Sequence, residues 1–249
     1  MNSSPAAAKT PAGLARPAAA QGRRPRNARG QGSRLTDDIV SGALALIERE
    51  GSDEAVTLRA VAREIGIAAP SIYAHFPDRD AIVMAAVARI FDELTVAVGA
   101  GLNSAGQDPA DRLVAGCEGY VAFGLGHPAR YGVLFSERRI AGARAGDYCK
   151  PVPIGPDGRP VLEFGAESFA LLVNAVTACV SAGVSASTDV VADSTAVWVA
   201  LHGAVSLRTA LPRFPWPGLD QFVRQLVLPL AKVTERPART AAAASASGH

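Results

Sequence analysis

The segment from Val56 to Phe76 constrains the fold most, because it places a glycine between two short apolar repeats. In its first half, apolar residues recur at i, i+3, i+4 and i+7, which predicts a helix with one buried face. These residues are Leu58, Val61, Ala62 and Ile65. Thr57 precedes the repeat as an N-cap, and Gly66 follows it, where a left-handed backbone costs little. The pattern therefore predicts a short helix followed by a sharp turn.

The second half of this segment predicts another short helix. Pro70 lies in its first turn, where a missing N–H does no harm, and Ile72 and Phe76 are spaced to face the interior. The residues left outside are Ser71, Tyr73, Ala74 and His75. Two helices with this turn and this outer face form a helix-turn-helix, whose second helix enters the major groove of DNA. A plain αα-hairpin shares the same apolar spacing and is the alternative interpretation.

At these residues the chain resembles the TetR family of transcriptional regulators. The matching positions are Thr57, Leu58, Arg59, Ala62, Arg63, Glu64, Gly66, Tyr73, His75, Phe76 and Arg79. The resemblance covers residues 35–98 and implies an all-α protein, with a helix-turn-helix head on a larger helical body for ligand binding and dimerisation. Two positions differ from the commonest residue: Ala68 stands where many members carry a Ser N-cap, and Arg79, which supplies the basic residue of the pattern, stands where Lys is usual.

The resemblance also implies which side chains meet double-stranded DNA. Those expected to contact phosphate and fix the register are Thr57, Ser71, Tyr73, His75 and Arg79. Those expected to approach base edges are Ala69, Pro70 and Ala74, and Leu58 and Arg59 complete the predicted DNA-binding set. Apolar contact with thymine methyl groups is therefore expected in place of bidentate base recognition, except through Arg59.

Charge divides the chain into three parts. Residues 1–34 hold seven bases and no acid, residues 35–80 hold four bases and nine acids, and residues 81–249 hold fourteen of each. The first part cannot bury enough apolar surface to fold alone, which predicts a disordered basic arm over residues 1–34. Such an arm adds phosphate contacts or enters the minor groove. A solvated tail without a role and an organellar transit peptide are the alternatives.

Beyond the helix-turn-helix domain at residues 35–80, helical periodicity predicts a body over residues 81–235 and a disordered tail over 236–249. A turn-rich loop is expected at residues 136–160. A pocket for an unknown small-molecule effector is expected among the middle helices, with apolar walls and few polar groups. Its predicted lining is Cys117, Tyr120, Phe123, Tyr131, Phe135, Phe169, Leu172, Asn174 and Val176. Residue by residue, ordinary core packing explains these side chains equally well.

The last two predicted helices indicate a homodimer. Apolar residues repeat regularly from Leu219 to Leu230, and two such helices from each subunit would form a four-helix interface. The expected interface residues are Trp198, Leu201, Val205, Phe222, Leu226 and Leu230. Trp198, His202 and Gly203 also resemble a C-terminal domain type of TetR-like regulators that is marked by Trp, His and Gly. Because a dimer presents two recognition helices about 34–36 Å apart, the operator is expected to be a near-palindrome.

No spacing of histidines or cysteines indicates catalysis, a cofactor or a metal site. The histidines are His75, His127, His202 and His249, and the cysteines are Cys117, Cys149 and Cys179. Three thiols without a secretory signal predict a cytoplasmic protein with no membrane partner. Cys149 is the one candidate redox switch, and the alternative interpretation is that it is an inert surface thiol.

The sequence therefore predicts a non-enzymatic regulator, a repressor that a small molecule releases from its operator. Activation of transcription would use the same DNA contacts. A helical-bundle enzyme using His127 and His202, and a pure dimerisation scaffold, are the alternatives from other classes.

Overall fold

The computed structural model of the protein describes residues 32–135 and 165–234. Over these residues the chain is all-α, as predicted, and the only β pairing between them is an isolated antiparallel bridge of Ser185 with Val233. The predictions made for the basic arm, the turn-rich loop, Cys149 and the C-terminal tail fall almost wholly outside the described residues.

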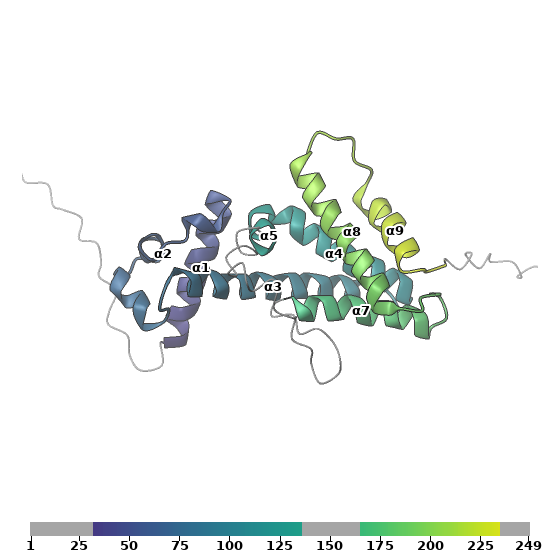
Figure 1. Ribbon diagram of the computed structural model, residues 1–249, viewed down its shortest axis with the longest axis horizontal. Coiled ribbons are helices and arrows are strands. Elements are labelled where there is room, and N and C mark those ends of the chain that lie inside the picture. The colour runs from purple at the N-terminus through teal and green to yellow at the C-terminus, as the bar shows by residue number, and fades with distance from the viewer. Residues whose placement is uncertain (1–31, 136–164, 235–249) are drawn as a thin grey trace, which may run out of the picture.

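The molecule has a small head at one end and a larger helical body at the other (Figure 1). The head contains α1 (Gly32–Glu50), η1 (Asp53–Ala55), α2 (Leu58–Glu64) and η2 (Ala69–Ala74). The other described helices are α3 (Arg79–Ser104), α4 (Pro109–Gly126), α5 (Pro128–Leu134), α7 (Ala166–Ser181), α8 (Val190–Ala210) and α9 (Leu219–Leu230). Because α3 begins in the head and runs on beside α4 and α7, head and body share one helix.

Local signals in the sequence set several helix ends. The Thr57 hydroxyl accepts from the Ala60 N–H at 3.1 Å and caps α2. Gly66 has a φ of +72° and turns the chain after α2, as its position predicts. Helix α1 begins at Gly32, so Thr36 lies inside it and caps nothing. The hydroxyl of Thr36 instead bonds Nδ1 of His75 at 3.0 Å, across the head.

Helices α3 and α4 approach each other closely because glycines lie at their crossing. A Cβ added to Gly101 would lie 2.2 Å from the carbonyl oxygen of Ala115, and one added to Gly119 would lie 2.5 Å from the carbonyl oxygen of Ala97. Real Cβ atoms do not come so near a backbone oxygen, so the two helices can pack in this way only with glycine at both positions. This contact fixes the wall on which the body's cavity is built.

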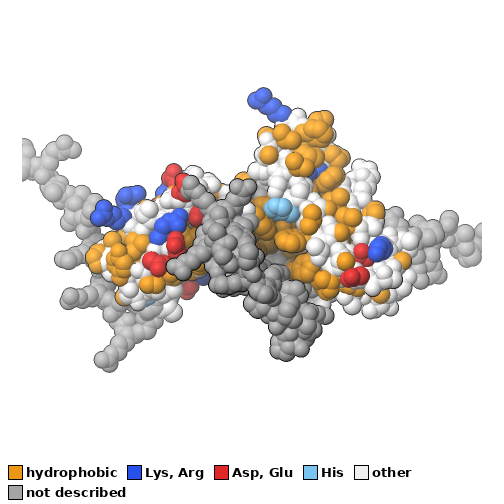
Figure 2. Space-filling model, viewed as in Figure 1, with side chains coloured by type: hydrophobic (Ala, Val, Ile, Leu, Met, Phe, Trp, Pro, Cys, Tyr) orange, Lys and Arg blue, Asp and Glu red, His pale blue; other side chains and the backbone are white. Residues whose placement is uncertain are grey.

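Helix α8 is apolar on almost every side. By length and composition it is the one described helix able to cross a membrane, with a mean hydropathy of 1.4. It packs against α4, α7 and α9, however, and the core helix of a soluble bundle has the same composition. Some of the apolar side chains of α8 lie on the surface of the molecule, where orange side chains gather over this helix in Figure 2. Those that are exposed are Val191, Trp198, Val199 and Leu207.

Candidate DNA-binding surface and ligand pocket

The recognition segment is helical, as predicted, but it is not an α-helix. It forms 3₁₀ turns over η2, and Ala68 supplies no side-chain cap. Ile72 and Phe76 are buried as predicted, and they hold the segment on the head core. Tyr73 is 63% exposed, which is unusual for a large aromatic side chain and leaves its hydroxyl open to a partner. Pro70, Ser71 and Ala74 are exposed on the same segment.

Three residues predicted to meet DNA are engaged inside the head. Arg79 donates to the backbone oxygen of Asp53 at 2.5 Å and to its neighbour Asp80 at 3.1 Å, which ties the start of α3 to η1. His75 is bonded to Thr36, and Leu58 packs against the core. The structure therefore gives these side chains a role in holding the recognition segment, whatever contact they make with DNA.

Two exposed cations of the head lie on α2. Arg59 and Arg63 are four residues apart, so they share one helix face, and both are exposed. Arg49 on α1 is instead occupied by both carboxylate oxygens of Glu64, at 3.2 and 3.0 Å. Arg63 was left out of the predicted DNA-binding set, although it is one of the few cations of the head and matches the family pattern. Its spacing from Arg59 was the signal that would have found it.

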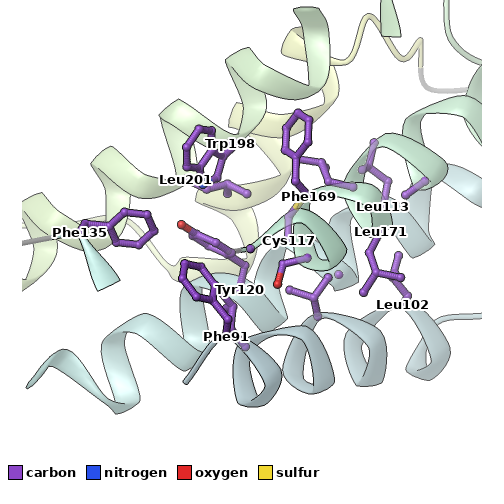
Figure 3. A pocket seen from close by; sticks show the side chains of 17 residues that line it. Phe91, Leu102, Leu113, Cys117, Tyr120, Phe135, Phe169, Leu171, Trp198 and Leu201 are labelled. Atoms are coloured by element: carbon purple, nitrogen blue, oxygen red, sulfur yellow. The ribbon is translucent and has the colours of Figure 1, made fainter. Parts of the chain in front are cut away.

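The body contains an apolar cavity of about 180 Å³ between α3, α4, α7 and α8 (Figure 3). Aromatic side chains from four parts of the chain meet there: Phe91 from α3, Tyr120 from α4, Phe169 from α7 and Trp198 from α8. Among the described lining residues, none is Asp, Glu, Lys, Arg or His. The wall therefore suits an apolar guest far better than an ion.

The predicted pocket lining is placed correctly in part. The predicted residues that line the cavity are Cys117, Tyr120, Phe135, Phe169 and Leu172. Those that do not line it are Phe123, Tyr131, Asn174 and Val176. Asn174 is exposed on the outer face of α7, while the others are buried where helices pack on one another. Apolar spacing along one helix cannot distinguish a side chain that faces a neighbouring helix from one that faces a cavity.

The pocket also uses residues that the sequence analysis did not assign to it. These are chiefly Phe91, Leu94, Val98 and Leu102 of α3, Leu171 of α7, and Trp198 and Leu201 of α8. The four residues of α3 follow the helical repeat at i, i+3, i+7 and i+11, so the sequence shows their common face but not what it covers. Their place in the wall means that a guest would touch the same helix that enters the head.

A chain of hydrogen bonds leads from the pocket toward the surface of α8. The Tyr120 hydroxyl lies 2.8 Å from that of Tyr131 on α5, which lies 2.7 Å from Nδ1 of His202. Burial raises the pKa of both tyrosines and lowers the pKa of His202. The three groups are therefore held in their neutral forms, as links between α4, α5 and α8.

The expected dimer residues divide into two groups. Leu201 and Val205 are 2% and 1% exposed in the single chain, so the expectation that they face a second subunit was wrong. Leu201 faces the pocket, and Val205 packs against Gly124 of α4. Trp198 remains partly exposed, and the α9 residues Phe222, Leu226 and Leu230 are half-buried. Because α8 is apolar all round, its sequence does not show which side packs inward.

The alternative of a helical-bundle enzyme rested on His127 and His202, and the structure places these two side chains among different partners. His202 belongs to the tyrosine chain, and Nδ1 of His127 lies 3.8 Å from Glu48. Over residues 32–135 and 165–234, no three His, Cys, Asp or Glu side chains gather as metal ligands would. Cys117 and Cys179 are buried, and burial raises the pKa of both thiols, that of Cys179 to about 11.

The helix-turn-helix head shares one long helix with an all-helical body, and this body holds an apolar cavity. These features define a class of DNA-binding proteins with an attached ligand domain. Residues 39–86 match the family model for bacterial regulatory proteins of the tetR family. Residues 113–228 match that of the tetracyclin repressor-like C-terminal domain. The chain therefore belongs to the TetR family. The finer resemblance to the Trp-His-Gly type of C-terminal domain stays a prediction.

Individual relatives extend this assignment. The uncharacterized HTH-type transcriptional regulator Rv0681 of Mycobacterium tuberculosis is 34% identical over 98 residues, which span 38% of this chain and 42% of that protein. A protein of unknown function from Rhodococcus sp. RHA1 aligns with a TM-score of 0.63 and 23% identity, covering 79% of this chain and 93% of that one. RolR, solved with resorcinol, aligns with a TM-score of 0.55 and 17% identity, covering 82% of this chain and 90% of that one. At these identities the two structural matches show a shared fold.

Proposed function

We propose that the protein is a homodimeric, sequence-specific repressor that leaves a near-palindromic operator when a small molecule occupies the body. The observation that carries this proposal is the continuity of α3. Its first turn is tied to the head through Arg79, and Phe91, Leu94 and Val98 further along form a wall of the pocket. A change in the pocket is therefore transmitted to the head by one rigid element.

The exposed surface of the head supports DNA binding. Tyr73 and Ser71 of η2 and the two arginines of α2 present hydrogen-bond donors outward. Hydroxyl and guanidinium groups are the usual contacts to phosphate, whereas Pro70 and Ala74 offer only apolar contact to base edges. A DNA partner also agrees with the cytoplasmic location expected from the sequence.

The outer face of α8 supports dimerisation. Val191, Trp198 and Val199 are exposed apolar residues on a helix that packs inward through α4, α7 and α9. A contiguous apolar surface of this kind marks an interaction site, and a two-fold dimer would bury the same patch from both subunits. We place the interface on these residues, together with the half-buried side chains of α9, in place of Leu201 and Val205.

A small helix links the body to the head and supports release by ligand. Arg130 of α5 donates to Glu48 of α1 at 2.9 Å and to Glu93 of α3 at 2.7 Å. Its neighbour Tyr131 is bonded to Tyr120 in the pocket wall. A guest that favours one position of α5 would thus favour one position of the head, and a coupling of about 1–3 kcal/mol is enough for regulation. RolR, of the same fold, is solved with a small-molecule ligand.

The test is selection of binding sites from random duplex DNA, with wild type, Tyr73→Ala and Val96→Ala. Val96 is a suitable control because it is 71% exposed and lies on α3, away from the recognition segment. We expect wild type and the control to recover the same near-palindromic motif and Tyr73→Ala to lose it. His75→Ala is avoided, because it would break the bond to Thr36. Salt-sensitive binding without a motif would contradict the proposal.

Repression is tested with the selected site placed over a promoter that drives a reporter. We expect the wild-type protein to lower reporter output and Tyr73→Ala to restore it. Higher output in the presence of the wild-type protein would instead identify an activator, since the DNA contacts do not distinguish the two.

A further inference from the structure

We propose that the pocket takes an uncharged, mainly apolar molecule about the size of one substituted ring, with a hydroxyl or carbonyl group that hydrogen-bonds to Tyr120. This inference rests on the proposed function, because it takes the pocket as the effector site. Three features of the described residues support it: the size of the cavity, the absence of charge in its described wall, and the hydrogen-bond chain that ends at Tyr120.

The size of the cavity sets the size of the guest. Its volume is about 180 Å³, and apolar cavities of about 150 Å³ in proteins accommodate benzene. One ring with a short substituent therefore fills the space. Phe91, Phe135 and Phe169 approach it from different sides in Figure 3, an arrangement that suits a flat apolar guest in edge or offset contact.

The polar side chains of the described wall carry no charge. The Ser168 hydroxyl lies 2.5 Å from that of Thr95, which donates to the carbonyl oxygen of Phe91 at 2.8 Å. Burial of the Cys117 thiol raises its pKa, which keeps it protonated. A carboxylate or ammonium group in this cavity would lose its hydration and gain no opposite charge from the described wall. A neutral guest avoids this cost.

Tyr120 differs from Ser168 in what it offers a guest, because Ser168 gives its proton to Thr95 and can only accept, whereas the Tyr120 hydroxyl can accept or donate, depending on the direction of its hydrogen-bond chain. If Nδ1 of His202 accepts, Tyr131 donates to it and Tyr120 donates to Tyr131, so the Tyr120 oxygen accepts from the Trp198 side chain and keeps one acceptor position for a guest. If Nδ1 donates, the chain reverses and the Tyr120 proton is free to donate. A hydroxyl group on the guest satisfies either direction, and a carbonyl group satisfies the second.

The hydroxyl of Tyr120 also lies where a guest can reach it. In Figure 3 it points toward the end of the pocket between Phe135 and Trp198. The polar group of the guest is therefore expected at this end, with its apolar body lying toward Leu102 and Leu113.

The experiment compares four probes of nearly equal size by isothermal titration calorimetry on the full chain: 4-ethylphenol, ethylbenzene, benzoate and benzylammonium. We expect 4-ethylphenol to bind about tenfold more tightly than ethylbenzene, the usual effect of one hydrogen bond. Both ions should bind at least about a hundredfold more weakly than 4-ethylphenol. An ion that binds as tightly as 4-ethylphenol, equal binding of the two neutral probes, or no binding of any probe would overturn the inference.

Two variants test whether Tyr120 causes the preference for 4-ethylphenol over ethylbenzene. Tyr120→Phe should bind the two neutral probes equally, while Thr177→Val, which removes a hydroxyl on the exposed face of α7, should keep the tenfold difference. A tenfold difference that survives in Tyr120→Phe would overturn the role of Tyr120. Circular dichroism checks the fold of each variant. If Tyr120→Phe fails to fold, the wild-type probe series still decides, because the charge and hydroxyl comparisons need no variant.

DNA affinity, measured with and without 4-ethylphenol, separates this inference from the proposed function. Specific DNA binding without any probe binding overturns the ligand class and leaves the DNA-binding function in place. Probe binding with the expected preferences and unchanged DNA affinity supports the ligand class and contradicts release by ligand.

Discussion

Arg130 of α5 and Glu48 of α1 are joined by an ion pair of 2.9 Å that connects the body to the head. The same guanidinium group pairs with Glu93 of α3 at 2.7 Å, so one side chain holds three helices together. A planar guanidinium suits this arrangement because it can donate to two carboxylates at once. The contact makes α5 part of the head as much as of the body.

Arg130→Met is expected to loosen the end of α1. The apolar stem is kept while both ion pairs are lost, so the free energy of unfolding should fall by no more than about 1 kcal/mol. Hydrogen exchange measured by mass spectrometry should become faster in the last turns of α1 and in α5. Arg224→Met removes a pair of equal length, to Asp111, far from the head, and is the control. Equal exchange in α1 of both variants would contradict a linking role for Arg130.

Two glycines of α3 should respond to alanine with opposite signs. Gly101→Ala places a Cβ against the backbone of α4, which cannot move away cheaply, and should lower the free energy of unfolding by about 1–3 kcal/mol. Gly99→Ala meets nothing within 4 Å and should raise it by about 0.5–1 kcal/mol, because alanine loses less entropy in a helix. Urea unfolding measures both. Changes of the same sign would mean that α3 and α4 cross differently.

The proposed dimer surface is tested with two exposed valines. Val199 on α8 is 59% exposed, and Val199→Asp should convert the proposed dimer to a monomer, because it places a charge from each subunit in the proposed apolar interface. Val96→Asp introduces the same change on α3 and should leave the dimer intact. Analytical ultracentrifugation distinguishes these results. If Val96→Asp dissociates the protein and Val199→Asp does not, the interface lies on another face.

The pH dependence of stability should report on His202. Burial lowers the pKa of its imidazole, so the unfolded chain binds the proton more tightly than the folded one. The stabilising effect of the neutral ring is therefore present above the ordinary pKa of about 6.5 and is lost as pH falls below it toward the folded-state value. Thermal unfolding between pH 7.5 and 5 should show wild type losing more stability than His202→Gln. Parallel curves for the two proteins would contradict this.

The helix-turn-helix was predictable because local interactions determine it. Thr57 caps α2 through a residue three positions away, and Gly66 supplies the positive φ of the turn. Burial of Ile72 and Phe76 follows from their spacing. The tethers of His75 and Arg79 were not predictable, because their partners Thr36 and Asp53 are 39 and 26 positions away.

The pocket was predicted only in part for the same reason. The sequence identified apolar helices, and several of their residues line the cavity, including Tyr120 and Phe169. It did not identify the contribution of α3, because a repeated apolar face shows only that something covers it.

By itself, the sequence determined the helices, the head and the family, since caps, turn glycines and apolar spacing act within a few residues. Tertiary packing decided which sides of the helices face each other. Leu201 points inward and Val199 outward on a helix that is apolar all round, and only the positions of α4, α7 and α9 distinguish them. The same packing brought Tyr120 and His202, 82 positions apart, into one hydrogen-bond chain through Tyr131.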